Sequence, residues 1–437
     1  MTATNPTRLS FDVVVVGAGP AGIAAAVSAA GSGARTALVD DNPAPGGQIW
    51  RATERAPERS PSAAAWFERL RSAPVHHVFG ARVFRADGGV VCAETADGLL
   101  HIAYRDLILA TGARERFLPF PGWTLLNVLG AGGLQALAKS GLPVRDKRIV
   151  IAGTGPLLLA VAAYLQDHGA AVVAICEQSS RTTLARFGWH ALRAPGKIRE
   201  ARQLFRRIRR VPLWTNSWPI AALGADGRLQ ALRISKNGEV REIECDYVGC
   251  GFHLVPNVEL PSSLGCELEN GFVRVDDFQR TSLPHIYCAG EPTGIGGLEL
   301  SLAEGEIAGH AAAGHPETGV PLFAQRGQYR RFARALAQAC SLRLELKKLA
   351  QTDTWICRCE DVSLERLREH DSWRAAKLQT RCGMGPCQGR ICGAALDFLF
   401  GWDTGAARAP IFPATCASLA SAVPSAHGLD ASNGGAQ

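Results

Sequence analysis

The stretch "FDVVVVGAGPAGIAAAVSAAGSGARTALVDD" (residues 11–41) decides the fold of this chain. An apolar run from Val13 to Val16 leads into Gly17, Gly19 and Gly22, which stand in G-x-G-x-x-G spacing. An alanine-rich segment with helical character follows, and then a second apolar run that ends at Asp40. This order of strand, glycine turn, helix, strand and acid predicts a dinucleotide-binding βαβ unit. The complete pattern is a much stronger signal than the glycines alone.

Each residue of this motif has a physical task in binding a dinucleotide. Gly17 allows the tight turn, Gly19 lets a pyrophosphate approach the backbone, and Gly22 lets the helix pack close to the strand. The helix N-terminus then faces the phosphates. Asp40 is in place to accept a hydrogen bond from a ribose hydroxyl, with Asp41 as the alternative acid.

Two later segments favour a flavin over a nicotinamide at this first site. "YRDLILATGARE" (residues 104–115) places Thr111 and Gly112 after an apolar strand, and "TSLPHIYCAGEPTGIGG" (residues 281–297) ends a strand at Gly290 and Glu291. This spacing resembles the glutathione-reductase-like flavoproteins, which have two dinucleotide-binding domains. The resemblance implies FAD in a discontinuous domain. The group usually has aspartate where Glu291 stands, and that acid contacts the ribityl chain.

A second motif, "DKRIVIAGTGPLLLAVAAYLQDHGAAVVAICEQ" (residues 146–178), is incomplete. Gly153 and Gly155 match the first two glycines, but Leu158 stands at the third, where it should alter the fit of a dinucleotide. Glu177 could hold a ribose. The pattern predicts a second Rossmann-like domain. It leaves open whether this domain is structural, holds an adenine nucleotide without redox turnover, or binds NAD.

The strongest chemical signal is "WICRCEDVSLERLREHDSWRAAKLQTRCGMGPCQGRICGAALDFLF" (residues 355–400). It holds five cysteines within 36 residues: Cys357, Cys359, Cys382, Cys387 and Cys392. Thiolates grouped in this way hold an iron–sulfur cluster or a soft metal. Zinc is the weaker alternative, because structural zinc sites favour C-x-x-C pairs. No C-x-x-C pair stands beside the flavin motifs either, which argues against a disulfide reductase.

The cysteine pattern C-x-C-E-x-V, followed by G-M-G-x-C-Q-G-x-x-C, resembles the [2Fe–2S] domain related to bacterioferritin-associated ferredoxin. In opine oxidases, D-hydroxyproline dehydrogenases and hydrogen cyanide synthase, this domain is fused to a flavoprotein subunit. The motifs "GGQIW", "GTGPLLLA" and "GEPTGIGG" extend the resemblance over residues 10–415, and the first adds Gly47 and Gln48 to the expected flavin contacts. The family's ligands map onto Cys357, Cys359, Cys387 and Cys392, with Cys382 left over.

Together these signals predict an α/β protein with two Rossmann-like dinucleotide-binding domains and a small helical, cysteine-rich [2Fe–2S] domain. We expect the flavin domain at residues 1–138 and 268–325 and the second Rossmann-like domain at 139–267. A connecting helix should cover 326–349, the cluster domain 350–420, and a disordered tail 421–437.

Composition restricts the cellular setting. A net charge of +7 on 437 residues does not indicate a nucleic-acid partner. The basic run Lys197–Arg210 suits a solvated helix face, with a partner interface as the alternative. The N-terminus lacks a basic start followed by an apolar stretch. Glycines and a proline interrupt the apolar stretches 13–30 and 149–165. We therefore expect a cytoplasmic protein without a transmembrane segment.

The sequence shows electron-transfer equipment but no acid–base pair, nucleophile motif or carboxylate clamp, so no catalytic residue is assigned. The resemblance implies an electron-relay subunit of a heteromeric amine or amino-acid dehydrogenase. A D-amino-acid-oxidase-like partner would bind the substrate, with opine, hydroxyproline or glycine as candidates, and a one-electron acceptor would follow. The first site would hold FAD or another adenine nucleotide, with room for a second nucleotide or an FMN shared with the partner. The alternatives are a stand-alone NAD(P)H-dependent ferredoxin- or quinone-type reductase, and an iron–sulfur scaffold module.

Overall fold

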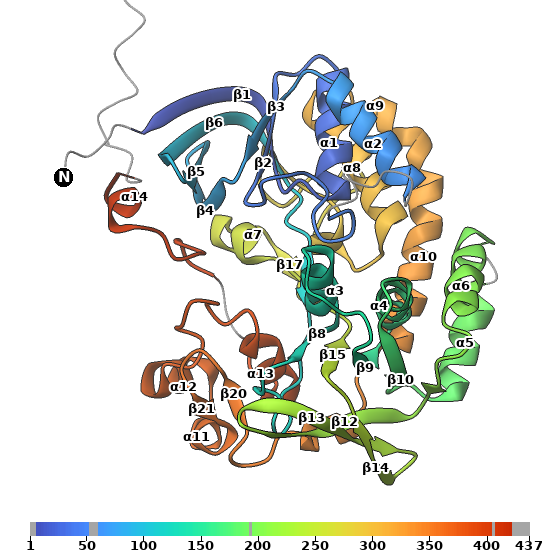
Figure 1. Ribbon diagram of the computed structural model, residues 1–437. Coiled ribbons are helices and arrows are strands. Elements are labelled where there is room, and N and C mark those ends of the chain that lie inside the picture. The colour runs from blue at the N-terminus through green and yellow to red at the C-terminus, as the bar shows by residue number, and fades with distance from the viewer. Residues whose placement is uncertain (1–5, 52–59, 192–194, 404–406, 422–437) are drawn as a thin grey trace, which may run out of the picture.

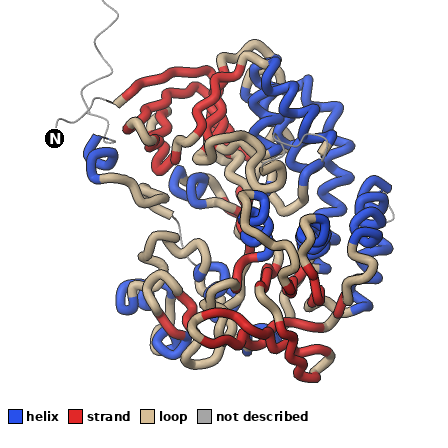
Figure 2. The backbone as a smooth tube through the Cα atoms, viewed as in Figure 1, coloured by secondary structure: helices blue, strands red, loops and turns tan. Residues whose placement is uncertain are grey.

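The computed structural model describes residues 6–51, 60–191, 195–403 and 407–421 (Figure 1). The tail expected over 421–437 lies, apart from its first residue, outside this part of the chain. Figure 2 shows the strands in separate groups toward the two ends of the molecule, with most helices along one side. The structure confirms the predicted α/β class, with two Rossmann-like units and a C-terminal cysteine-rich region.

The first sheet has seven strands in the order β3-β2-β1-β6-β5-β4, and β19 pairs with β6. The strands β1, β2, β3, β6 and β19 run parallel, and β4 and β5 form an antiparallel extension. Their bounds are β1 Thr7–Val16, β2 Thr36–Asp40, β3 Val75–Phe79, β4 Arg82–Asp87, β5 Val90–Thr95, β6 Gly98–Leu109 and β19 Ile286–Cys288. Because β19 joins this sheet, the first Rossmann-like unit is built from two distant stretches of chain.

Two helices that are far apart in sequence cover one face of this sheet close to the glycine turn. They are α1 (Pro20–Gly31) and α8 (Leu298–Ala312), which pack against each other. Glycines make the close approach possible, because a Cβ on Gly305 or Gly309 of α8 would lie 2.2–2.3 Å from backbone oxygens of α1. Nearby α2 (Pro61–Ser72) completes the layer.

The second sheet has the order β11-β10-β9-β15-β8, and all of its pairings are parallel. Its strands are β8 Val128–Gly130, β9 Arg148–Thr154, β10 Ala171–Glu177, β11 Leu213–Trp214 and β15 Tyr247–Phe252. Helices accompany it at α3 Ala131–Lys139, α4 Pro156–Asp167, α5 Arg181–Ala191 and α6 Pro195–Arg207. An antiparallel meander stands beside it, with β12 Ser217–Ala225, β13 Arg228–Lys236 and β14 Glu239–Glu244.

Both apolar stretches of the sequence form strand–turn–helix units, as their glycines predicted. Val13, Val14 and Val15 of β1 are fully buried, which is typical of a central strand covered on both faces. The strand β9 and helix α4 repeat the arrangement in the second unit. In the described part of the chain, no helix has the length and hydrophobicity needed to cross a membrane.

The last quarter of the chain begins with the long helix α10 (Phe323–Ala339) and a short 3₁₀ turn, Leu344–Lys348. The cysteine-rich region follows, with β20 Trp355–Cys357, β21 Val362–Ser363, α11 Leu364–Arg368, α12 Trp373–Thr380 and α13 Cys392–Phe400. Leu346, Leu349 and Ala395 pack into the core of the second unit. The chain then returns to the first sheet, where Glu94 accepts hydrogen bonds at the start of α14 (Cys416–Ser421).

Candidate functional site

The first glycine turn has the geometry that a dinucleotide site needs. Gly17 has φ +108°, and a Cβ there would lie 2.2 Å from the Ala110 carbonyl oxygen. A Cβ on Gly22 would lie 1.7 Å from the Gly17 carbonyl oxygen, so the third glycine is what allows α1 to approach β1. Both positions therefore require glycine, for the reasons that the sequence predicted.

Gly19 faces open space, in contrast to the other two glycines. A Cβ on Gly19 would meet no atom outside its own chain neighbours closer than the Gly47 Cα, at 4.0 Å. The N-terminus of α1 has no capping side chain and no acid in its first turn. Free N–H groups and the helix dipole favour an anionic group at this point. The turn fits the pyrophosphate of FAD or of another adenine nucleotide.

The predicted ribose acid and the loop beside it lie next to this turn. The Asp40 carboxylate, at the end of β2, accepts a 2.5 Å hydrogen bond from the Ala18 backbone N–H and remains partly exposed. Gly47 lies against Gly19, since a Cβ on Gly47 would be 2.9 Å from the Gly19 Cα. Gln48 follows with an exposed side chain. The fold thus brings these predicted contacts to one edge of the sheet.

The segment after β6 is held firmly at the same edge. The Thr111 hydroxyl donates to the Asn257 carbonyl oxygen at 2.6 Å, and the Asn257 side chain donates back to the Thr111 carbonyl oxygen at 2.9 Å. Gly112 continues the turn with φ +71°. This pair of bonds joins the exit of β6 to the residue that follows β16 (Leu254–Pro256).

Two acids, of which sequence analysis found one, lie beside the glycines at the start of α8: Glu291, which is partly buried, and Glu304 of α8, which is buried. Glu291 accepts a 2.9 Å hydrogen bond from the Gly297 N–H. Glu304 accepts from the Gly290 N–H at 3.1 Å and forms a 3.0 Å ion pair with Arg330. Helix α8 also contains Glu299 and Glu306, so no signal in the sequence singled out Glu304. Burial, with a smaller effect from the Glu304 carboxylate, raises the pKa of Glu291 to about 7.

The Glu291→Gln variant should change the pH dependence of stability. Because the pKa of Glu291 rises from 4.5 to about 7 on folding, this carboxyl destabilises the native state as pH increases through that interval. Glutamine does not titrate, and its side-chain oxygen can still accept from Gly297. We expect the melting temperatures of both proteins to agree near pH 4.5, and the variant to be more stable by a few degrees near pH 8. Parallel melting curves across this range would contradict the assignment.

The second glycine turn differs from the first in its backbone. Gly155 has φ +102°, whereas Gly19 at the same position has φ −76°. The acid of the second motif, Glu177, accepts a hydrogen bond from the turn at the Gly155 backbone N–H, whereas Asp40 of the first motif accepts from Ala18, one residue earlier in its turn. Leu158 is buried in the core of this unit. In the second motif, Leu158 replaces the third glycine, and the backbone of the preceding turn also has a different conformation.

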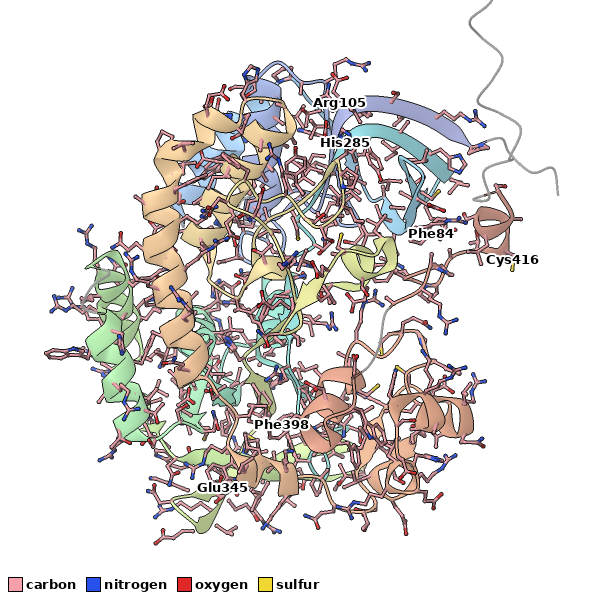
Figure 3. The ribbon with its side chains drawn as sticks, turned by 180° about the vertical axis from the view of Figure 1, so that it is seen from behind. Phe84, Arg105, His285, Glu345, Phe398 and Cys416 are labelled. Atoms are coloured by element: carbon pink, nitrogen blue, oxygen red, sulfur yellow. The ribbon has the colours of Figure 1, made fainter. Side chains whose placement is uncertain are left out.

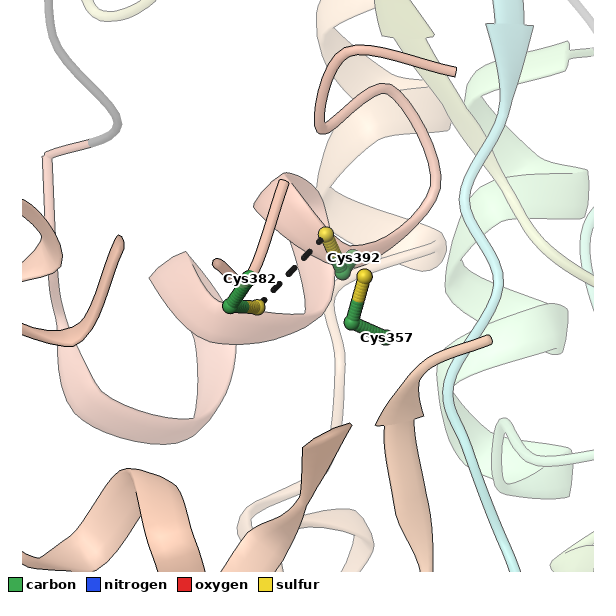
Figure 4. Close-up of side chains that lie close together, drawn as sticks. All are labelled: Cys357, Cys382 and Cys392. Atoms are coloured by element: carbon green, nitrogen blue, oxygen red, sulfur yellow. Dashed lines mark hydrogen bonds between the residues drawn. The ribbon is translucent and has the colours of Figure 1, made fainter. Parts of the chain in front are cut away.

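The cysteine-rich region brings three sulfur atoms together in its core. The Sγ atoms of Cys357, Cys382 and Cys392 all lie within 4.8 Å of one another, and those of Cys382 and Cys392 are 4.0 Å apart (Figure 4). All three residues are buried. The structure thus groups Cys382, which the resemblance leaves without a role, with two of the predicted ligands.

The other two predicted ligands form a second, more exposed pair next to this group. The thiol of Cys359 contacts that of Cys387, and Cys359 is exposed. The cysteine-rich region therefore contains a buried group of three thiols and a more exposed pair. Two of the four predicted ligands, Cys357 and Cys392, belong to the buried group, and the other two form the exposed pair. Two pairs of thiolates are what a [2Fe–2S] cluster requires. Cys416 is not part of this arrangement, since it lies near Phe84 of the first unit and away from Phe398 of α13 (Figure 3).

The backbone around these thiols fits a negatively charged cluster. Hydrogen bonds from the Cys382 and Cys392 thiols, with a smaller contribution from the Gly383 and Glu360 N–H groups, lower the pKa of the Cys357 thiol to about 2. A Cβ on Gly385 would lie 2.3 Å from the Cys359 Cβ, so glycine is needed where the loop passes this ligand. Thiolate donors, inward N–H groups and a close-fitting glycine loop suit an iron–sulfur centre.

Arg114, which sequence analysis missed, joins the cysteine loop to the first site. It stands on β7 (Ala113–Glu115), directly after Gly112. Its Nε donates to the Arg390 carbonyl oxygen at 3.0 Å, and its Nη1 donates to Asn257 at 2.7 Å and pairs with Glu259 at 2.8 Å. Arg390 lies between Cys387 and Cys392. The Arg114 side chain therefore connects the loop between Cys387 and Cys392 to Asn257, the residue that also bonds to Thr111.

Comparison with known proteins shows the family to which this chain belongs. The profile of the pyridine nucleotide-disulphide oxidoreductase family matches residues 11–313. This chain belongs to that family. It is therefore a flavoprotein of the oxidoreductase class, as the first glycine motif and the later strand motif predicted. The C-terminal cysteine-rich region lies outside the residues that match this family.

Sequence relatives cover nearly the whole of this flavoprotein. One subunit of the opine oxidase of Rhizobium meliloti is 31% identical over 99% of this chain and 92% of its own. The HcnB subunit of the hydrogen cyanide synthase of Pseudomonas aeruginosa is 32% identical over 87% of this chain and 90% of its own. These relatives confirm the opine oxidase and hydrogen cyanide synthase group to which the cysteine motifs pointed.

Solved structures agree on the fold. An L-proline dehydrogenase from P. horikoshii superposes with a TM-score of 0.63 at 18% identity, covering 95% of this chain and 80% of its own. A thioredoxin reductase from T. acidophilum gives a TM-score of 0.53 at 22% identity, covering 70% of this chain and 98% of its own. The thioredoxin reductase therefore matches a smaller part of this flavoprotein than the proline dehydrogenase does.

Proposed function

We propose that this chain is the electron-relay subunit of a heteromeric dehydrogenase that oxidises an amine or amino-acid carbon–nitrogen bond. One observation carries the proposal: a dinucleotide turn with open space at Gly19 and a five-thiol group lie in one chain, joined through Arg114. The opine oxidase and hydrogen cyanide synthase relatives both bear the names of enzyme subunits, which supports a partner chain.

In this proposal the first turn holds FAD, or another adenine nucleotide, and Cys357, Cys359, Cys387 and Cys392 hold a [2Fe–2S] cluster. When bound, a flavin supplies two-electron chemistry and an iron–sulfur cluster supplies one-electron chemistry. The N–H groups at the start of α1 orient the pyrophosphate, and Asp40 faces the ribose. Arg114 keeps the Cys387–Cys392 loop close to the segment that follows Thr111.

The substrate site belongs, in this proposal, to a D-amino-acid-oxidase-like partner. No acid–base pair or carboxylate clamp stands out in the sequence. The name of one relative suggests an opine as the substrate. A hydroxyproline and glycine are the other candidates that the sequence resemblance implies. A lasting electron path between chains needs a permanent interface, so we expect it to bury more than about 2,000 Å² in total.

Co-expression with a D-amino-acid-oxidase-like chain, sought among the reading frames next to this gene, tests the proposal. We expect amine-dependent dye reduction from the two chains together and none from either chain alone, because the relay and the substrate site lie on different polypeptides. Purification through a tag on this chain should also recover the partner. Full activity of this chain alone on an opine, hydroxyproline or glycine would refute the relay role and place the missing catalytic residues here.

A further inference from the structure

The second glycine turn is covered by the chain's own residues 339–343, which are the last residue of α10 and the four residues after it. The Cys340 sulfur lies 3.2 Å from the position that a Cβ on Gly155 would take. In a functional dinucleotide motif, the second glycine leaves this space to the pyrophosphate. At Gly19, the equivalent glycine of the first motif, no such atom is closer than 4.0 Å. The space beside the second glycine is therefore open in the first turn and in contact with Cys340 in the second turn.

Side chains at the carboxyl end of β10 hold this covering segment in place. The Ser179 hydroxyl donates to the Ala339 carbonyl oxygen at 2.8 Å. The Gln178 side chain donates to the Ser341 carbonyl oxygen at 2.9 Å and accepts from the Arg343 backbone N–H at 3.2 Å. Gln178 is fully buried. These residues directly follow the motif's acid, so the segment lies where the ribose of a bound nucleotide would be.

The acid of the second motif is itself enclosed. Glu177 is only 6% exposed. One of its oxygens accepts from the Thr154 hydroxyl at 2.6 Å and from the Ser179 N–H at 2.8 Å, and the other accepts from the Gly155 N–H at 2.8 Å. Internal bonds of this kind offset the cost of burying a carboxyl group. The acid that would hold a ribose is thus satisfied by the protein.

We propose that residues 339–343 occupy the second dinucleotide motif and thereby determine which electron donor this flavoprotein can use. With the phosphate and ribose positions filled by its own chain, the second unit excludes NADH and NADPH. The electrons that reduce this flavoprotein must then come from a donor other than NADH or NADPH. This inference rests on contacts between residues 339–343 and the second unit of the same chain, and it holds whether or not the proposed partner exists.

Two measurements on the wild-type holoprotein test the inference directly. Titration of the full chain with NADH, followed by NADH fluorescence, should show no saturable binding up to about 1 mM. Under anaerobic alkylation followed by peptide mass spectrometry, the buried Cys340 should react at least roughly a hundredfold more slowly than the exposed Cys416. Saturable NADH binding, or equal labelling of the two cysteines, would overturn the proposal.

The Gln178→Ala variant tests whether the observed bonds hold the segment. It removes two hydrogen bonds to residues 341 and 343, so Cys340 should be labelled about tenfold faster or more. Gln325→Ala is the control, because Gln325 stands on α10, which leads into the covering segment, and its side chain donates to the Tyr329 hydroxyl within the same helix. Unchanged Cys340 labelling in a folded Gln178→Ala protein would also contradict the proposal.

Discussion

Replacing Cys357, Cys359, Cys387 or Cys392 by serine is expected to abolish the iron–sulfur centre. Each substitution removes one of the thiolates that two iron ions need, and a serine hydroxyl does not replace a soft sulfur donor at neutral pH. The visible absorbance of the cluster and the EPR signal of the reduced protein should both disappear. Iron and acid-labile sulfide should fall from about two per chain to background. All of this can be measured without assaying activity.

The matched control is Cys382→Ser, because Cys382 lies in the same buried group yet has no place in the predicted ligand set. This variant should keep its cluster. If it instead loses the EPR signal while Cys359→Ser keeps it, the ligands are the buried group of Cys357, Cys382 and Cys392. One zinc and no iron per chain in the anaerobically purified wild type would exclude an iron–sulfur centre altogether.

The Gly19→Val variant is expected to lose the nucleotide of the first site. The backbone at Gly19 has φ −76°, which valine can adopt, so the variant should fold. Its branched side chain would fill the space that the pyrophosphate needs. Adenine nucleotide released by denaturation and measured by chromatography should fall from about one per chain to below a tenth of that.

Gly31→Val provides the control for this variant. Gly31 lies at the other end of α1, and a Cβ there would meet nothing within 4 Å. The control should therefore keep its full nucleotide content. An equal loss in both variants would mean that valine disturbs α1 rather than the phosphate position. Absence of any adenine nucleotide in the wild type would show that the cofactor assignment is wrong.

The sequence alone determined the local units and the family. Gly17, Gly19, Gly22 and Asp40 encode their unit within thirty residues, because a tight turn, a phosphate approach and a helix contact each require a particular residue at a set spacing. The fold class follows from two such units. The cysteine spacing likewise pointed to the opine oxidase group, which the relatives confirm. The boundaries of the domains and the cofactor contacts of single residues stay predictions.

Tertiary structure decided what long-range contacts do to these units. Leu158 indicated that the second motif was altered, but only packing placed Cys340, which lies 185 residues beyond Gly155 in the chain, over the turn. In the same way, only packing grouped Cys382 with Cys357 and Cys392. A motif records the local backbone that a site requires. Whether the site is open or filled depends on distant segments, whose docking follows from burial and hydrogen bonding and leaves no periodic signal in the sequence.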